Sequence, residues 1–325
     1  MRLEAAHGAH STFLDELAQD VRAGLAGAGQ KSLPSRYLYD DLGSALFEAI
    51  GFLPEYGLTR ADERIVRAHA REIVAAMGHP PTIAELGSGS GRKTRWLLEA
   101  LGPKRPVRYH PIDISAAALE RCDLELSRLP AVTVDPIEAD YLSGLSLVAS
   151  RRRSDERLLL LFLGSTIGNF EPAEAREFIR EVRGRLRPGD GFLLGTDLVK
   201  PAPALIAAYD DALGVTAAFD LNLLLRLNRE LEAGFDLELF RHEARWNTKE
   251  RRVEMHLVAR RAHTVRIRAL DLTVEFRQGE SIWTESSYKF RLDEPGRIAR
   301  DARFSAAGQW TDREWPFAET LLIAR

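Results

Sequence analysis

The sequence predicts an α/β fold in which helices cover both faces of a mostly parallel sheet, together with a second α+β domain. Three observations support this prediction. Short apolar runs alternate with helical segments across residues 81–200, which is typical of a parallel α/β sheet. A glycine-rich turn follows the first apolar run and precedes a helix. Residues 236–290 contain long β-type runs, so a differently organised region interrupts the alternation.

The alternating region predicts five parallel strands to which a hairpin is added. The strands are expected at residues 82–86, 107–114, 132–138, 157–163 and 191–196. Helices are expected between them at residues 92–102, 115–128 and 172–187. Residues 303–324 predict a final antiparallel hairpin. Because ligands bind at the carboxyl ends of the strands in such sheets, functional residues are expected just after each strand.

The rest of the chain predicts a second domain built from two separated segments. Residues 12–76 are expected to form helices with a break at Pro54, and residues 201–232 two further helices. Strand-like runs follow at residues 237–246, 253–261, 264–267 and 272–276. We therefore predict a substrate-binding domain of residues 1–60 and 199–289, and a cofactor-binding domain of residues 61–198 and 290–325.

The composition restricts the class of protein. The 325 residues are 45% hydrophobic and 29% charged, as in an ordinary soluble globular protein, and the net charge of −3 gives no reason to expect nucleic acid or an anionic membrane. One cysteine, Cys122, excludes a disulfide framework and a cysteine zinc cage, and no metal is implied. Apolar runs of about six residues are too short to span a membrane. Charged and polar residues near the N-terminus argue against a signal peptide, so we expect a cytoplasmic monomer.

Residues 83–91, Ile-Ala-Glu-Leu-Gly-Ser-Gly-Ser-Gly, are the most informative stretch. Glycines allow close approach to a ligand, and the following helix start offers free N–H groups. The dinucleotide pattern G-x-G-x-x-G fits poorly because position 92 is Arg, and Lys93 lacks the spacer of a phosphate-binding lysine loop. The segment resembles motif I of class I S-adenosylmethionine (SAM) methyltransferases, whose sheet is Rossmann-like. A plain turn is the alternative.

Acidic residues lie at the ends of the second and third strands. Asp113 is placed to accept hydrogen bonds from the two ribose hydroxyls of a nucleoside, although it is also placed to cap the helix beginning near Ser115. Asp140 and Tyr141 end the third strand, where a carboxylate and an aromatic ring suit the amino group and the face of adenine. These positions predict the nucleoside end of a cofactor site.

The fourth strand ends in Gly164-Ser165-Thr166-Ile167-Gly168-Asn169, where the methyl acceptor is expected. Asn169 can donate and accept hydrogen bonds at once, which suits the zwitterionic head group of an amino acid. An Asn beside a Gly is also a common turn residue, so the residues alone leave both interpretations open.

Several ordered blocks of the chain resemble the histidine-specific Nα-methyltransferases of ergothioneine biosynthesis. They are residues 37–40, 54–56, 163–169, 195–200, 208–211, 214–219, 228–231 and 284–290. The resemblance covers nearly the whole chain. It implies SAM-dependent trimethylation of the α-amine of L-histidine, through methylated intermediates, to give hercynine.

The resemblance implies a catalytic group of Tyr56, Asn169 and Tyr209 around the head group of the substrate. Tyr56 and Asn169 would hold the amine. Asn169 and Tyr209 would hold the carboxylate, and Tyr39 would assist them. Without the resemblance, these tyrosines are ordinary half-buried aromatic residues.

The resemblance also implies an imidazole pocket formed by Glu285 and Ser287 and lined by Met255. Residues two apart on a strand project from one face, so Glu285 and Ser287 can reach the two ring nitrogens. Alone, Glu285 would be an edge-strand charge. If this pair does not bind a ring, a methyltransferase for another amino acid or imidazole compound is the alternative, and a non-catalytic SAM-binding protein is a second one.

Contacts with SAM are assigned to residues of the strand ends and the glycine loop: Glu85, Gly87, Ser88, Gly89, Lys93, Asp113, Asp140, Tyr141 and Gly164. Two departures from the family pattern stand out. Gly91 and Arg92 extend the motif I loop, and Gly57-Leu58 replaces an aromatic–proline pair after Tyr56. Both could alter cofactor affinity or the mouth of the site, but neither removes an expected contact.

Overall fold

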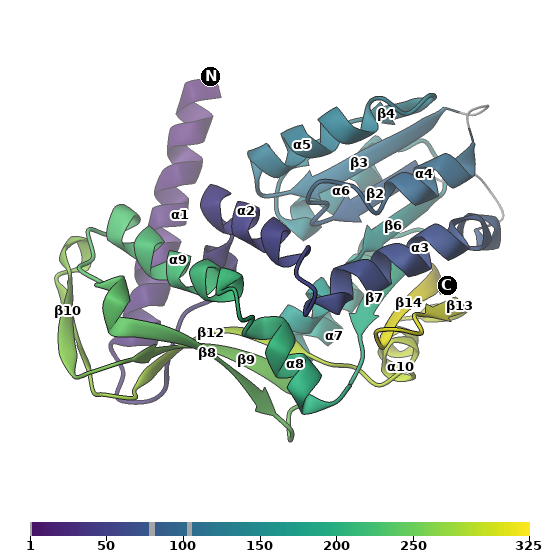
Figure 1. The fold of residues 1–325 in the computed structure, drawn as a ribbon. Helices are drawn as coiled ribbons and strands as arrows, with labels where there is room; N and C mark the ends of the chain where they lie inside the picture. The colour runs from purple at the N-terminus through teal and green to yellow at the C-terminus, as the bar shows by residue number, and fades with distance from the viewer. Residues whose placement is uncertain (1, 78–81, 103–105) are drawn as a thin grey trace. The chain divides into compact units, whose positions relative to one another are not determined.

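The computed structural model describes residues 2–77, 82–102 and 106–325 (Figure 1). The chain forms two compact units. Unit 1 contains Met1–Tyr56 and Ala202–Ser286, and unit 2 contains Gly57–Pro201 and Ser287–Arg325. The assignment of substrate to one domain and cofactor to the other stays a prediction.

Unit 2 is built on an eight-stranded sheet with the order β13-β14-β7-β6-β2-β3-β4, in which β5 also pairs with β3. The strands from β2 to β7 run parallel, whereas β14 runs antiparallel to both β7 and β13. This confirms the predicted parallel sheet with a terminal hairpin. The strands are β2 (Thr82–Leu86), β3 (Val107–Asp113), β4 (Val132–Val134), β5 (Ile137–Glu138), β6 (Leu158–Phe162), β7 (Gly191–Asp197), β13 (Phe304–Thr311) and β14 (Phe317–Ala324).

Helices cover both faces of this sheet, as predicted. Alternate residues of β6 point to opposite faces, and both faces are buried because every residue of the strand is apolar. Leu159 and Leu161 pack with one set of helices, and Leu160 and Phe162 pack with the other. The first set is α3 (Gly57–Ala76), α4 (Arg95–Leu101) and α5 (Ala116–Leu126), and the second is α6 (Tyr141–Arg151), α7 (Pro172–Arg185) and α10 (Glu294–Asp301).

The structure corrects four details of unit 2. Helix α4 begins at Arg95 because residues 92–94 form a turn after the glycine loop. The strand expected at 132–138 is two short strands, since Pro136 has no N–H to donate between them. Helices α6 and α10 were not expected. The four Ser and Gly residues of α6 give it a low helix propensity, and tertiary packing forms it nonetheless.

Unit 1 combines helices with a second, smaller sheet. Its four-stranded sheet has the order β1-β12-β9-β8, and β10 and β11 form a separate antiparallel pair. Helix α9 packs against α2 and β8, burying the apolar residues Phe219, Leu223 and Leu227 along one side. The elements are α1 (Arg2–Leu25), β1 (Lys31–Ser32), α2 (Asp41–Ile50), α8 (Ala202–Tyr209), α9 (Val215–Glu230), β8 (Phe240–Asn247), β9 (Arg252–Ala259), β10 (His263–Ile267), β11 (Leu272–Phe276) and β12 (Ser281–Tyr288).

The predicted helices at 12–76 and 201–232 are confirmed in outline, but the short strand β1 between α1 and α2 was not expected. Its two residues pair in parallel with Ile282 and Trp283 of β12, so long-range pairing rather than local sequence defines it. None of the described helices combines the length and apolar character that crossing a bilayer requires.

Candidate active site

The glycine loop of unit 2 joins β2 to α4 beside the point where the strand order of the sheet reverses. Strands β3 and β6 flank β2, and such switch points are where open α/β sheets bind ligands. Gly87, Gly89 and Gly91 have φ angles of +67°, +53° and +69°, which side chains rarely adopt. A Cβ added to Gly89 would meet no described atom within 4 Å, so the backbone here can be approached closely.

The glycine in each departure from the family pattern has a packing explanation. A Cβ at Gly91 would lie 2.6 Å from Cys122 Sγ and 2.7 Å from a Leu126 methyl carbon of α5. A Cβ at Gly57 would lie 2.3 Å from the ring of Trp315. Both glycines therefore permit close packing within unit 2.

Asp113, at the end of β3, is held between the loop and α5. Its Oδ2 accepts a hydrogen bond from Gly89 N at 3.2 Å and its Oδ1 accepts one from Ser115 N at 3.0 Å. The N-cap of α5 is Ser115, whose Oγ accepts from Ala118 N, so Asp113 is not the helix cap. Burial raises the pKa of Asp113 despite these backbone donors. Each carboxylate oxygen can accept a second hydrogen bond, as a ribose diol requires.

Glu85 lies beneath the loop and is almost fully buried. Its Oε2 accepts hydrogen bonds from Thr94 Oγ1 and from the Tyr109 hydroxyl, each at 2.5 Å. Burial raises the pKa of Glu85 to about 7, against the effect of these two donors. Because Thr94 immediately precedes α4, Glu85 anchors the end of the loop to the sheet.

Two buried acids, Asp62 and Glu319, and the half-buried Lys93 support the end of β6. Lys93 Nζ forms an ion pair with Asp62 Oδ2, which also accepts a hydrogen bond from Gly164 N at 2.8 Å. Although burial opposes its charge, Asp62 raises the pKa of Lys93. Glu319 is fully buried on β14. Burial and the charge of Asp62 raise its pKa well above the ordinary range.

Glu319 and Asp62 were missed by the sequence analysis. Among the described residues, neither carboxyl oxygen of Glu319 nor Asp62 Oδ1 has a hydrogen-bond partner. A proton on Glu319 makes it a donor to the Asp62 carboxylate and resolves this facing pair of acceptors. A glutamate in the otherwise apolar segment 317–324 was the available signal.

Asp140 and Tyr141 begin α6. Asp140 is the N-cap, and its Oδ1 accepts hydrogen bonds from Leu142 N and Ser143 N at 3.0 Å. Although burial opposes this, these donors hold the pKa of Asp140 below its ordinary value. The Tyr141 ring packs edge-on against Phe162, and its hydroxyl lies 3.3 Å from where a Cβ of Gly87 would be. Tyr141 therefore lies next to the glycine loop.

Asn169 ends a short 3-10 helix, Thr166–Asn169, that follows β6. Ser165 precedes this helix in the left-handed conformation at φ +60°, and its Oγ accepts a hydrogen bond from Asp197 N at 2.9 Å. Gly168 N donates to Ser165 O at 2.8 Å. The turn that carries the half-buried Asn169 is thus fixed to β7.

A second buried charged group, which the sequence analysis did not identify, lies beside Ser287 in unit 2. Lys289 Nζ pairs with Asp197 Oδ2 at 2.9 Å and donates a hydrogen bond to Ser287 Oγ at 2.8 Å. Lys200 Nζ contacts Asp197 Oδ1 at 2.5 Å. Burial lowers the pKa of Lys200 to about 8. Charged residues inside the matched blocks 195–200 and 284–290 were the signal.

In unit 1, the predicted substrate residues meet through their side chains. The Tyr39 hydroxyl donates a hydrogen bond to Glu285 Oε1 at 3.2 Å, and its ring packs edge-on against Phe219. The rings of Tyr56 and Tyr209 are edge-on with centroids 5.8 Å apart, and both residues are buried. The structure thus brings Tyr56 next to Tyr209, both predicted at the head group, and places Tyr39 against Glu285 of the predicted imidazole pocket.

Met255 and Glu285 lie on neighbouring strands of the unit 1 sheet, β9 and β12. Met255 is buried, and its carbonyl accepts a hydrogen bond from Thr284 Oγ1 at 3.0 Å. Glu285 is also buried, with only 7% of its surface exposed. Asn169 and Ser287 belong to unit 2, unlike the other predicted substrate residues.

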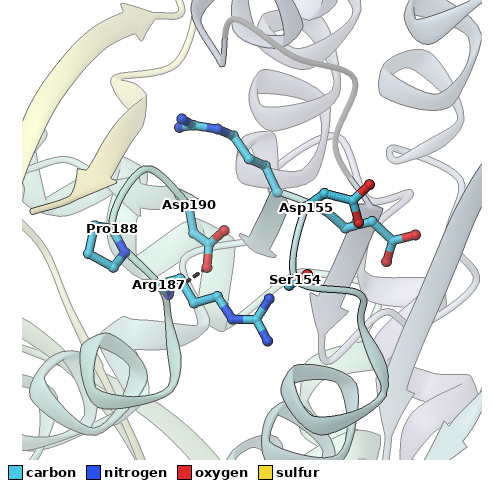
Figure 2. A pocket seen from close by; sticks show the side chains of 7 residues that line it. Ser154, Asp155, Arg187, Pro188 and Asp190 are labelled. Atoms are coloured by element: carbon cyan, nitrogen blue, oxygen red, sulfur yellow. Dashed lines mark hydrogen bonds between the residues drawn. The ribbon is translucent and has the colours of Figure 1, made fainter.

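A cavity of about 320 Å³ lies away from these residues, at the amino ends of β6 and β7 (Figure 2). Its lining is charged and includes Asp155, Arg187 and Asp190. Asp190 accepts hydrogen bonds from Arg187 N at 2.6 Å and Leu158 N at 2.9 Å, so it organises the strand starts. The predicted cofactor residues lie at the opposite, carboxyl ends of the strands.

Comparisons with known proteins identify relatives of this chain. Residues 17–324 match the sequence model of a family described as histidine-specific, SAM-dependent methyltransferases. The chain is 44% identical over 311 residues to the histidine N-alpha-methyltransferase of Mycolicibacterium smegmatis, with 95% of each chain covered. It is 43% identical to the protein of that name from Mycobacterium tuberculosis, with 94% of each covered. Ergothioneine biosynthesis protein 1 of Neurospora crassa is 29% identical over 87% of this chain and 32% of its own length.

Proposed function

Because this chain belongs to the family of SAM-dependent, histidine-specific methyltransferases, we propose that it transfers three methyl groups from SAM to the α-amine of L-histidine, giving hercynine. The observation that carries the proposal is the identity of 44% with a histidine N-alpha-methyltransferase over 95% of both chains. The class I methyltransferase sheet and the arrangement of the predicted residues support it. The place of the reaction in ergothioneine biosynthesis is part of the proposal.

The residues of the glycine loop and β3 fit SAM. Gly89 is open to close approach, and its N–H binds the same Asp113 carboxylate that would accept the ribose hydroxyls. Lys93 and Gly164, joined through Asp62, would lie at the methionine end. When bound, SAM supplies an electrophilic methyl group on a sulfonium. Orienting the acceptor amine in line with that methyl is the main contribution expected of the protein.

The substrate head group would be held by Tyr56, Asn169 and Tyr209. Only a neutral amine can attack, so a proton must leave before each of the three transfers. Tyr56 and Asn169 accept hydrogen bonds from the amine N–H groups and so aim its lone pair at the methyl group, and water takes the proton. Asn169 and Tyr209 donate to the substrate carboxylate, which fixes the direction in which the amine points.

Histidine would be selected by polar groups that face its ring. Glu285 accepts a ring N–H, and the hydrogen bond from Tyr39 orients that carboxylate at 3.2 Å. Ser287 contacts the other ring nitrogen, and Lys289 holds its Oγ at 2.8 Å. A buried carboxylate that loses its partner is costly, so amino acids with apolar rings are excluded.

The compartment, the oligomeric state and the absence of a nucleic-acid partner are also proposals. We propose that the enzyme acts as a cytoplasmic monomer on a small molecule and not on nucleic acid. The net charge of −3 supports the exclusion of nucleic acid, because it provides no attraction to a phosphate backbone. Light scattering of the purified protein tests the oligomeric state, and a dimer would contradict it.

Incubation of the purified protein with SAM and histidine tests the proposed activity. Mass spectrometry should show the addition of one, two and then three methyl groups, and fragment spectra should locate all of them on the α-nitrogen. Methyl on the imidazole would contradict the proposed orientation. Binding of SAM without methylation of histidine would favour another acceptor or a non-catalytic protein.

A further inference from the structure

His242 of β8 lies between two acceptor oxygens in the interior of unit 1. Its Nδ1 is 2.7 Å from Asp220 Oδ2 on α9, and its Nε2 is 2.7 Å from the carbonyl oxygen of Tyr209. The side chains of His242 and Asp220 are 1% and 0% exposed. These contacts connect three elements of the unit, since Tyr209 is the last residue of α8.

The chemistry of these partners determines the protons that the site holds. A carbonyl oxygen only accepts, so His242 Nε2 must carry a proton. A carboxylate also only accepts, so a second proton must lie between Nδ1 and Asp220. The Asp220–His242 pair therefore contains one proton more than a neutral histidine beside a carboxylate would. With that proton the pair has no net charge, and without it the pair would be a buried anion, which is costly.

The surrounding groups favour retention of this proton. Burial by itself lowers the pKa of His242, but its bonds to Asp220 and Tyr209 and the charge of Asp210 raise that pKa above its ordinary value. From β9, His256 contacts Ser281 Oγ and Glu254 Oε2, and burial and Arg245 lower the pKa of His256 despite the negative charges of Glu254 and Asp220. His256 therefore does not replace His242 as the cation that balances Asp220.

The location of the pair gives it a consequence for the substrate. The last carbonyls of a helix lack helical partners and carry partial negative charge, so a protonated imidazole binds well there. The next loop is fixed from its other side, because Asp211 accepts hydrogen bonds from Val215 N at 3.0 Å and Thr216 N at 2.8 Å at the start of α9. Tyr209 is thus held at the end of α8 by a network that returns to α9.

We propose that the protonated Asp220–His242 pair is a positioning device for Tyr209 and thereby sets the affinity for the carboxylate of the substrate. The inference rests on the proposed function, because Tyr209 binds that carboxylate only if the substrate is an amino acid. When the pair loses one of its two protons at alkaline pH, the remaining ring proton stays on Nδ1 beside the Asp220 carboxylate. His242 Nε2 and the Tyr209 carbonyl oxygen are then two acceptors that face each other. Tyr209 then loses its fixed position, and the KM for histidine increases while the affinity for SAM does not change.

The test compares the pH dependence of the KM for histidine in the wild-type enzyme and in Asp220→Asn. In the variant, a neutral His242 accepts from the Asn amide at Nδ1 and still donates to Tyr209 O from Nε2, so both bonds survive without the extra proton. The ratio of wild-type to variant KM should increase about tenfold from neutral to alkaline pH, as expected for the loss of one hydrogen bond. Titration of the substrate amine affects both enzymes equally and cancels in the ratio.

Asp271→Asn is the matched control, because the Asp271 side chain is 95% exposed in the same unit. It should reproduce the wild-type profile. A KM ratio that does not vary with pH, while both enzymes methylate histidine, would overturn the positioning role but leave the proposed function intact. Absence of histidine methylation by the wild-type enzyme would overturn both.

Nitrogen NMR of the wild-type protein keeps the inference testable if Asp220→Asn does not fold. One histidine ring should remain doubly protonated above the ordinary histidine pKa of about 6.5. If all eight histidine rings are neutral at that pH, the proposal is wrong.

Discussion

The two units hold their predicted functional side chains by different means. In unit 2, these side chains are held mainly by backbone groups and buried charges. Asp113 binds two backbone N–H groups, and Asp62 joins Lys93 to Gly164 N. In unit 1, side chains contact one another directly, as in the Tyr39–Glu285 hydrogen bond and the Tyr56–Tyr209 ring contact. A cofactor that many enzymes share would thus bind at a site formed by backbone groups. A specific substrate would bind at a site formed by side chains.

This difference has a consequence for substitution. A site made of backbone N–H groups survives the exchange of most neighbouring side chains, because the loop conformation is set by its glycines. A site made of paired side chains changes its selectivity when one partner changes, because the other is left unpaired. Substitutions in unit 1 should therefore alter which amino acid reacts, and those in unit 2 should alter the affinity for SAM.

The substitution with the largest expected effect concerns a residue that is an exception to this division. Asn169 belongs to unit 2, yet the proposal assigns it to the amine and carboxylate of the substrate. Asn169→Ala should reduce the transition-state stabilisation measured by kcat/KM for histidine by about 3 kcal/mol or more, because its hydrogen bonds to the substrate amine and to the charged carboxylate are lost. Steady-state kinetics measures this effect, and calorimetry should find an almost unchanged affinity for SAM. Unimpaired kinetics would make Asn169 a turn residue only.

Glu285→Ala sharpens the comparison from the side of unit 1. The free energy obtained from kcat/KM for histidine should become less favourable by about 2 kcal/mol, because a ring nitrogen loses its acceptor. Discrimination against amino acids with apolar rings should weaken. The ratio of kcat/KM for histidine to that for phenylalanine measures both changes. Glu275→Ala, which removes an exposed glutamate from β11, is the control and should leave the ratio unchanged. If Glu285→Ala also preserves it, Glu285 is structural.

The smallest effect concerns Glu319, whose pKa burial and Asp62 raise well above the ordinary range. The folded protein then keeps this proton to higher pH than the unfolded chain, so wild-type stability decreases as pH rises from the ordinary glutamate pKa through the raised one. Glu319→Gln retains a donor to Asp62 but cannot ionise. Its free energy of unfolding should match that of the wild type at acidic pH and exceed it at alkaline pH, as measured by urea denaturation. Parallel pH profiles would show that Glu319 is not protonated in the folded protein.

The sequence predicted the parts of the site that depend on local chain order. Asp113 ends a strand, Gly87 and Asn169 follow one, and the rule that ligands bind at carboxyl strand ends was enough to propose them. The same locality explains why the parallel strands and the hairpin were predicted well. Helix α6 was not predicted because its serines and glycine lower its helix propensity, although Asp140 was available as a capping signal.

Pairings between distant elements could not be predicted. Asp62 meets Glu319 only because α3 packs next to β14, and His242 meets Asp220 only because α9 packs against β8. Nothing near these residues in the sequence shows which charges become partners in the core. The aromatic residues of unit 1 were found through the family resemblance, since no local pattern distinguishes a substrate-binding tyrosine from one that merely packs.

Crossed calorimetric titrations of Asp113→Ala and Glu285→Ala, with SAM and histidine each added alone, test the division between the two units most directly. Asp113→Ala should weaken SAM binding by roughly 1.5–3 kcal/mol and leave histidine binding unchanged, because only the ribose loses its acceptor. Glu285→Ala should show the reverse pattern. Equal losses for both ligands in both variants, or unchanged SAM affinity in a folded Asp113→Ala protein, would contradict the account.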